Sequence, residues 1–136
     1  MAARWLFKTE PSAYSFDQLV RDGRTVWDGV KNALALKHLK AIAKGDEVLV
    51  YHTGDEKAAV GLATVVRGAF PDPKARDPRL VVVELAAERP LAHPVTLAAM
   101  KANRALAGFD LLRLPRLSVM PVSAAHWAEI LRMAKG

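Results

Sequence analysis

The chain has 136 residues, no cysteine and a formal net charge of +6 at pH 7. A chain of this length can bury its own hydrophobic core, so we expect one domain over residues 1–136. Without cysteine there are no disulfides, thiolate nucleophiles or cysteine zinc sites, and no apolar run is as long as a membrane span. We therefore expect a soluble, cytoplasmic protein with no membrane partner, and a monomer rather than an obligate oligomer. The basic charge favours polyanionic partners, nucleic acid first.

The N-terminal part of the chain predicts a strand followed by a helix. The strand covers RWLFK (4–8), where apolar and polar residues alternate. The helix covers 15–23, with Ser15 as its N-cap and Gly23 at its end.

A second helix is predicted over 32–45, from Asn32 as N-cap to Gly45. Apolar residues at helical spacing predict its buried face, which consists of Ala35, Leu36, Leu39, Ile42 and Ala43. Three lysines, spaced three and four apart, share the opposite face, and we call them the lysine stripe: Lys37, Lys40 and Lys44. The stripe is either a solvated face or a phosphate contact.

The rest of the chain is richer in strands. The predicted elements are strands at 46–53, 58–70 and 79–88, a helix at 96–106, a strand at 116–122 and a helix at 123–136. Within the second of these strands, Gly61 indicates a bulge or a close backbone approach. Strands and helices do not alternate regularly, so we expect an α+β domain with a strongly curved, mainly antiparallel sheet or a small barrel. Trp5 and Trp127 are expected in its core.

The common signatures of catalysis and metal binding are missing. The four histidines lack metal-ligand spacing, and no G-x-S-x-G elbow, G-x-G-x-x-G loop or P-loop is present. We therefore expect no metal and no cofactor, and we consider a classical enzyme the weaker hypothesis.

Polar and aromatic clusters lie at the predicted strand ends and beside the second helix. They are KTEP (8–11), WDGVKN (27–32), YHT (51–53) and RLS (116–118). If they converge at one rim of a curved sheet, they can form a ligand pocket beside a basic helix start, suited to a stacked base and a phosphate. Each residue also has a structural alternative: Trp27 can fill the core under a turn, and His52 can be a hydrogen-bonded strand-end histidine.

Seven motifs, in order over almost the whole chain, resemble those of the EVE domain family. They are WLFKTEPSAYSFDQL (5–19), WDGVKN (27–32), GDEVLVYHTG (45–54), GLATVV (61–66), FPDP (70–73), PVTLAAMKA (94–102) and LLRLPRLSVMPVSAAHW (111–127). The resemblance implies a PUA-like fold, a small curved mixed β-barrel or sheet flanked by helices. It also implies recognition of a modified base in nucleic acid, notably modified cytosine, in a pocket. The residues that match the family's pocket are Lys8, Thr9, Glu10, Trp27, Gly29, Val30, Lys31, Asn32, Tyr51, His52, Arg116, Leu117 and Ser118.

The chain departs from the family pattern after WDGV. Lys31 stands where an arginine is common, and Leu34 and Leu36 stand where a glutamine and a second arginine are common. An arginine binds phosphate bidentately or stacks on a base, and a lysine does neither as well. The leucines remove polar contacts from the first helical turn.

Two functions from different classes follow. The first is a non-catalytic module that reads a modified base in DNA or RNA, with Trp27, Asn32, Tyr51 and Ser118 in one pocket. There Trp27 would stack on the base, the Asn32 amide would read its edge, and the lysine stripe would contact phosphate.

The alternative is a small PUA-like enzyme acting on a nucleotide or small molecule, with Lys8, Glu10 and His52 as acid and base groups. These three side chains would then converge in the cleft that holds Trp27. A third possibility is a protein that works only within a complex.

Overall fold

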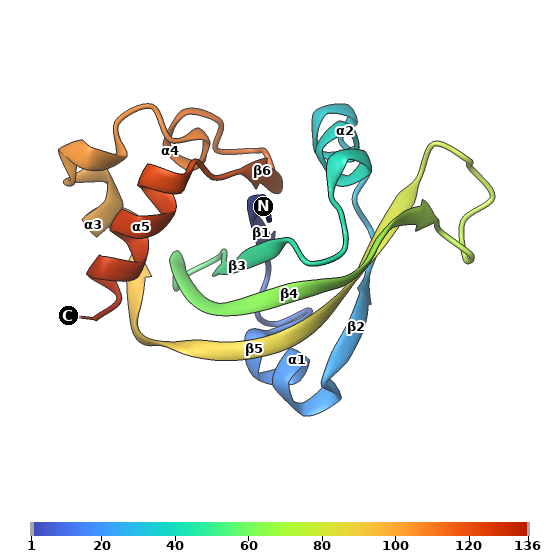
Figure 1. Ribbon diagram of the computed structural model, residues 1–136, viewed down its shortest axis with the longest axis horizontal. Coiled ribbons are helices and arrows are strands. Elements are labelled where there is room, and N and C mark those ends of the chain that lie inside the picture. Colours follow the sequence, from blue (N-terminus) through green and yellow to red (C-terminus); the bar gives the residue numbers. More distant parts are fainter. Residues whose placement is uncertain (1, 136) are drawn as a thin grey trace.

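One curved, six-stranded sheet frames the computed structural model, which describes residues 2–135 (Figure 1). The strands are β1 (Arg4–Thr9), β2 (Arg24–Trp27), β3 (Glu47–His52), β4 (Ala58–Pro71), β5 (Val81–Thr96) and β6 (Val119–Pro121). They lie in the order β2-β5-β4-β3-β1-β6, and every neighbouring pair is antiparallel except β1 and β3. Within the described residues the two edge strands, β2 and β6, do not pair, so this is a mixed open sheet and not a closed barrel. The predicted α+β class is confirmed.

The helices pack at three places around the sheet. They are α1 (Phe16–Asp22), α2 (Ala33–Ala41), α3 (Leu97–Lys101), α4 (Asp110–Arg113), α5 (Ala124–Met133) and a 3-10 turn, η1 (Arg104–Leu106). In Figure 1, α1 lies beside β2 and β5, α2 lies on the other side of the sheet, and α3, α4 and α5 gather at one end of the long β4–β5 ribbon. None of the helices in residues 2–135 is long and apolar enough to cross a membrane.

The predicted helix starts are confirmed by their capping bonds. The side chains of Ser15, Asn32, Thr96 and Ser123 each accept a hydrogen bond from the backbone N–H three residues later, which satisfies one free donor of the first turn. The predicted end of the second helix is wrong. That helix stops at Ala41, Ile42 is its C-cap, and Ala43 is exposed instead of buried.

Several other predicted boundaries need correction. Sequence patterns missed β2 and α4, two four-residue elements too short to show a hydrophobic period. The predicted helix at 96–106 is split into α3 and η1. Strand β5 runs on to Thr96 through Pro90 and Pro94. Since β2 pairs only with Val83 to Ala86, no strand of the described residues pairs with the outer side of β5 beyond that point, and prolines are tolerated there.

The core contains both expected tryptophans. Trp5 and Trp127 are buried, and a buried carboxylate anchors the first of them. Asp46, 5% exposed, accepts hydrogen bonds of 3.0 Å from the Trp5 indole N–H and from the backbone N–H groups of Ala3 and Ala43. Three donors compensate the cost of burying this charge, and they tie the chain before β1 to the turn before β3.

Gly61 marks both a bulge and a close approach, as predicted. The β4–β5 pairing shifts register between Ala59 and Gly61. A Cβ atom at position 61 would lie 2.4 Å from ring atoms of Phe16, which is buried at the start of α1. Only glycine lets α1 pack this closely on β4.

Candidate functional site

A cavity of about 740 Å³ opens where β1, β2 and two loops meet. Its volume is within the range of about 300–1,000 Å³ that is typical of small-ligand pockets. Many residues of the expected site line it: Lys8, Thr9, Glu10, Trp27, Gly29, Val30, Lys31 and Ser118. We call it the Trp27 cavity.

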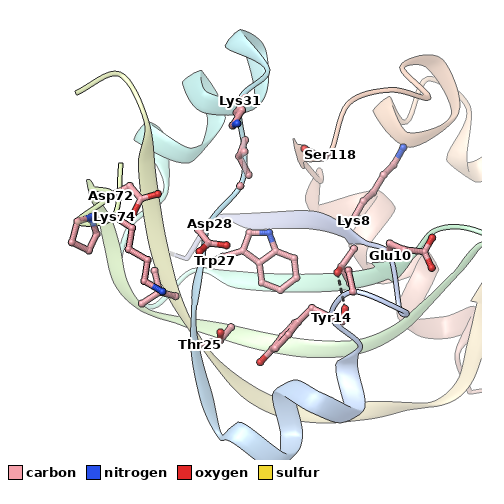
Figure 2. A pocket seen from close by; sticks show the side chains of 16 residues that line it. Lys8, Glu10, Tyr14, Thr25, Trp27, Asp28, Lys31, Asp72, Lys74 and Ser118 are labelled. Atoms are coloured by element: carbon pink, nitrogen blue, oxygen red, sulfur yellow. Dashed lines mark hydrogen bonds between the residues drawn. The ribbon is translucent and has the colours of Figure 1, made fainter. Parts of the chain in front are cut away.

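Trp27 lies at the centre of this cavity, at the end of β2 (Figure 2). The residue is only 8% exposed, and its ring makes edge contacts with the rings of Phe7 and Tyr14, whose centroids lie 5.5 and 6.1 Å from its own. The indole N–H has no hydrogen-bond partner within residues 2–135. No polar side-chain atom of those residues is both fully buried and unpaired, so this N–H keeps accessible surface on a residue that lines the cavity. Trp27 therefore fills the core with one side and offers a free donor with the other.

Charged side chains border the cavity on two sides of Trp27. Asp28 and Lys31 come from the β2–α2 connection, where Gly29 adopts a left-handed φ of 79° that favours glycine. Asp72 and Lys74 come from the β4–β5 loop (Figure 2). The Asp28 carboxylate is exposed and accepts no hydrogen bond from the described part of the chain, so it is available to a ligand.

Several lining residues were not expected from the sequence: Tyr14, Thr25, Asp28, Asp72 and Lys74. The sequence did point to Asp28 as a lining residue, because it lies inside the WDGVKN motif. Tyr14 is also in a family motif, and its hydroxyl donates to Asp22 at 2.8 Å. Burial, with Asp22 adding to it, raises the pKa of the Tyr14 phenol.

Lys8 and Glu10 line the cavity, but their charged ends are directed elsewhere. The Lys8 ammonium donates to the Pro115 carbonyl at 2.8 Å, and burial lowers the pKa of this lysine. The Glu10 carboxylate accepts from the backbone N–H and the hydroxyl of Ser12, at 3.3 and 3.2 Å. Figure 2 shows both side chains extending away from the Trp27 ring. The Lys8 side chain therefore holds the segment at Pro115, and the Glu10 side chain holds the turn at Ser12.

The structure does not bring Tyr51 and His52 into the cavity. Both are buried near the end of β3, which is covered on both faces. The Nε2 atom of His52 accepts from the Phe16 backbone N–H at 3.0 Å, and its Nδ1 lies 2.7 Å from Glu56 Oε1. The Nε2 atom thus holds the start of α1, and the Nδ1 atom ties the ring to Glu56 in the β3–β4 connection. Burial raises the pKa of Tyr51.

The remaining expected residues lie outside the Trp27 cavity. Asn32, Arg116 and Leu117 border a second, smaller hollow, so the expected grouping of Trp27, Asn32, Tyr51 and Ser118 holds only for Trp27 and Ser118. The lysine stripe is exposed but borders neither hollow, and Lys44 lies beyond the end of α2, so the three lysines do not share one helix face as predicted. Their contact with phosphate stays a prediction. Among the described residues, no cluster of His, Asp or Glu side chains could hold a metal ion.

The chain belongs to the EVE domain family, whose model matches residues 3–133. A Rhodopseudomonas palustris protein of known structure is 42% identical, with a TM-score of 0.94 over 98% of this chain and 94% of the other. Human thymocyte nuclear protein 1 is 26% identical over 167 residues, which cover 98% of this chain and 74% of the human protein. A structure of human THYN1 in complex with DNA containing 5-methylcytosine has a TM-score of 0.92 at 24% identity, over 99% of both chains. These likenesses confirm the family that the motifs indicated.

Proposed function

We propose that this protein is a non-catalytic, nucleic-acid-binding module that holds one modified base, 5-methylcytosine or a close analogue, in the Trp27 cavity. The observation that carries the proposal is an aromatic-walled cavity of about 740 Å³ with unused polar groups at its border. The human relative crystallised with 5-methylcytosine DNA shares the fold and supports the choice of base. We further propose that it acts as a cytoplasmic monomer of one domain, on DNA or RNA.

The chemistry of the cavity suits a cytosine. The Trp27 ring can pack on the base, and its free N–H can donate to a base acceptor. The Asp28 carboxylate is the kind of acceptor that reads the exocyclic amine of cytosine. Val26, which is 42% exposed and lines the cavity, offers an apolar contact for the extra methyl group. Asp28 thus takes the edge-reading role that the sequence had indicated for Asn32.

The geometry gives little support to the enzyme alternative. A general base must reach a substrate proton directly or through one water. His52 lies outside the cavity with both ring nitrogens occupied, and the Lys8 ammonium is bound to the Pro115 carbonyl. The three candidate acid and base groups therefore do not converge beside Trp27.

The experiment compares binding of single-stranded oligonucleotides that differ only in cytosine or 5-methylcytosine at one position. Fluorescence anisotropy should give tighter binding for the methylated strand. Asp28→Asn should weaken binding of both strands by about 10–100-fold, because it removes a charge-assisted hydrogen bond of roughly 1.5–3 kcal/mol. Trp27→Phe keeps an aromatic ring but loses the N–H, so about 1 kcal/mol or fivefold should be lost.

Asp17→Asn is the matched control, because Asp17 is exposed on α1 and does not line the Trp27 cavity. Recovered oligonucleotide should have an unchanged mass after long incubation with wild-type protein. Equal affinity for the two strands, or an altered mass, would contradict the proposal.

A further inference from the structure

A second hollow of about 300 Å³ lies directly beside the Trp27 cavity. In two segments of the chain, one residue lines the first hollow and the residue next to it lines the second. Lys31 lines the first and Asn32 the second, and Ser118 lines the first and Leu117 the second. The ammonium of Lys8, which lines the first hollow, donates at 2.8 Å to the carbonyl of Pro115, which lines the second, so the two hollows adjoin. We call the smaller one the Leu34 hollow.

The Leu34 hollow presents an unusual apolar surface. Leu34 is 42% exposed in the first turn of α2, where a solvated helix face would carry a polar residue. Among the described residues only Val20, Val26 and Leu34 are large, apolar and this exposed. One of the other two, Val26, lines the Trp27 cavity. Exposed apolar surface at two adjacent hollows is typical of a binding site.

Hydrogen-bond donors surround this apolar surface, and no carboxylate lines the described part of the hollow. Arg116 is exposed, and its guanidinium meets no acceptor in residues 2–135. The Oδ1 atom of Asn32 caps α2 by accepting from the Ala35 backbone N–H, which leaves the Nδ2 donor unpaired within the same residues. An apolar wall beside a cation and an amide donor is complementary to a base attached to a phosphate.

We propose that the Leu34 hollow binds the nucleotide next to the modified one on the same strand. Its base would pack on Leu34 and Leu117, and its phosphate or base edge would face Arg116. A single phosphate joins successive nucleotides, so a strand whose modified base enters the Trp27 cavity would bring its neighbour to the adjoining hollow. The inference rests on the proposed function, because it takes the modified base in the Trp27 cavity as its reference point.

The test uses 5-methylcytosine oligonucleotides in which one other nucleotide is replaced by an abasic analogue. An abasic position immediately 5′ or immediately 3′ of the modified base should weaken binding about tenfold on one of these two sides. An abasic position three nucleotides away is the control and should change affinity less than about twofold.

A protein variant connects this effect to the hollow. Leu34→Ser should weaken binding of the intact strand about fivefold, by removing apolar contact area, and should weaken binding of the abasic strand no further. Val20→Ser is the matched control, because Val20 is 50% exposed on α1 and lines neither hollow. Thermal melting of both variants verifies that they are folded.

Different results would refute the adjacent-nucleotide site and the modified-base reader. If wild-type protein prefers the methylated strand but neither abasic neighbour matters, the adjacent-nucleotide site is refuted and the base reader stands. The same holds if Leu34→Ser behaves like Val20→Ser. If wild-type protein shows no preference for the methylated strand, the modified-base reader itself is refuted.

Discussion

Gly61→Ala should destabilise the protein by crowding the contact between β4 and α1. The added Cβ atom would lie 2.4 Å from Cε1 and Cζ of the Phe16 ring, whereas carbon atoms pack best at about 3.5–4.0 Å. The ring must therefore retreat by more than about 1 Å. Phe16 is 3% exposed, and its backbone N–H is bound to His52, so it has little room to move.

The magnitude follows from two limits. Overpacking a core by one methyl group costs about 1–3 kcal/mol, and removing a buried phenylalanine from its site costs about 3–5 kcal/mol. We expect Gly61→Ala to lower the free energy of unfolding by about 2–4 kcal/mol, between these limits. Urea denaturation followed by circular dichroism measures this value. The melting temperature should fall by about 5–15 °C.

A double mutant tests the cause. Phe16→Leu makes space at the contact, so Gly61→Ala should cost at least about 1 kcal/mol less in that background. Strict additivity of the two substitutions, or a loss below about 0.5 kcal/mol for Gly61→Ala alone, would refute the close approach as the reason for this glycine.

Three further predictions concern His52, the lysine stripe and Glu129. His52→Ala should cost about 1–3 kcal/mol of stability, because it leaves a buried N–H unpaired, while oligonucleotide affinity of the folded variant stays unchanged in anisotropy. Replacing the lysine stripe with glutamine should weaken binding of methylated and plain single strands by the same factor, and the salt slope should fall by about 0.7 per lost phosphate contact. Hydrogen bonds from Arg132, then Asn103, lower the pKa of Glu129 to about 2, so its contribution to stability is complete above pH 4.5 and is lost as the pH falls through about 2. In Arg132→Gln an NMR titration should find this pKa shifted back toward 4.5.

The sequence predicted features whose cause is local. Ser15 and Asn32 begin helices because each side chain bonds a backbone N–H only three residues away. The bulge at Gly61 was also predictable, because a glycine inside an apolar strand commonly marks a bulge or a close approach. The family motifs then predicted half of the residues that line the Trp27 cavity.

Features that depend on distant pairing were not predictable from the pattern alone. Strand β2 exists because β5 provides its partner, and it brings Trp27 onto the sheet instead of into a turn. Asp72 reaches the cavity only because the long β4–β5 ribbon curves back beside β2. For His52 the sequence left two alternatives open, a pocket residue or a hydrogen-bonded strand-end histidine, and the structure shows the second.

The pairing of β1 with β6 has a consequence for how the site comes into being. Trp5 faces Pro121 in this pair, and the Lys8 backbone N–H donates to the Ser118 carbonyl at 2.9 Å. The wall of the Trp27 cavity is therefore built from opposite ends of the chain, and closing so long a loop is entropically costly and slow. A partly folded chain has no complete cavity. Since only the fully folded state can bind, an oligonucleotide ligand should raise the temperature of global unfolding and not merely order one loop.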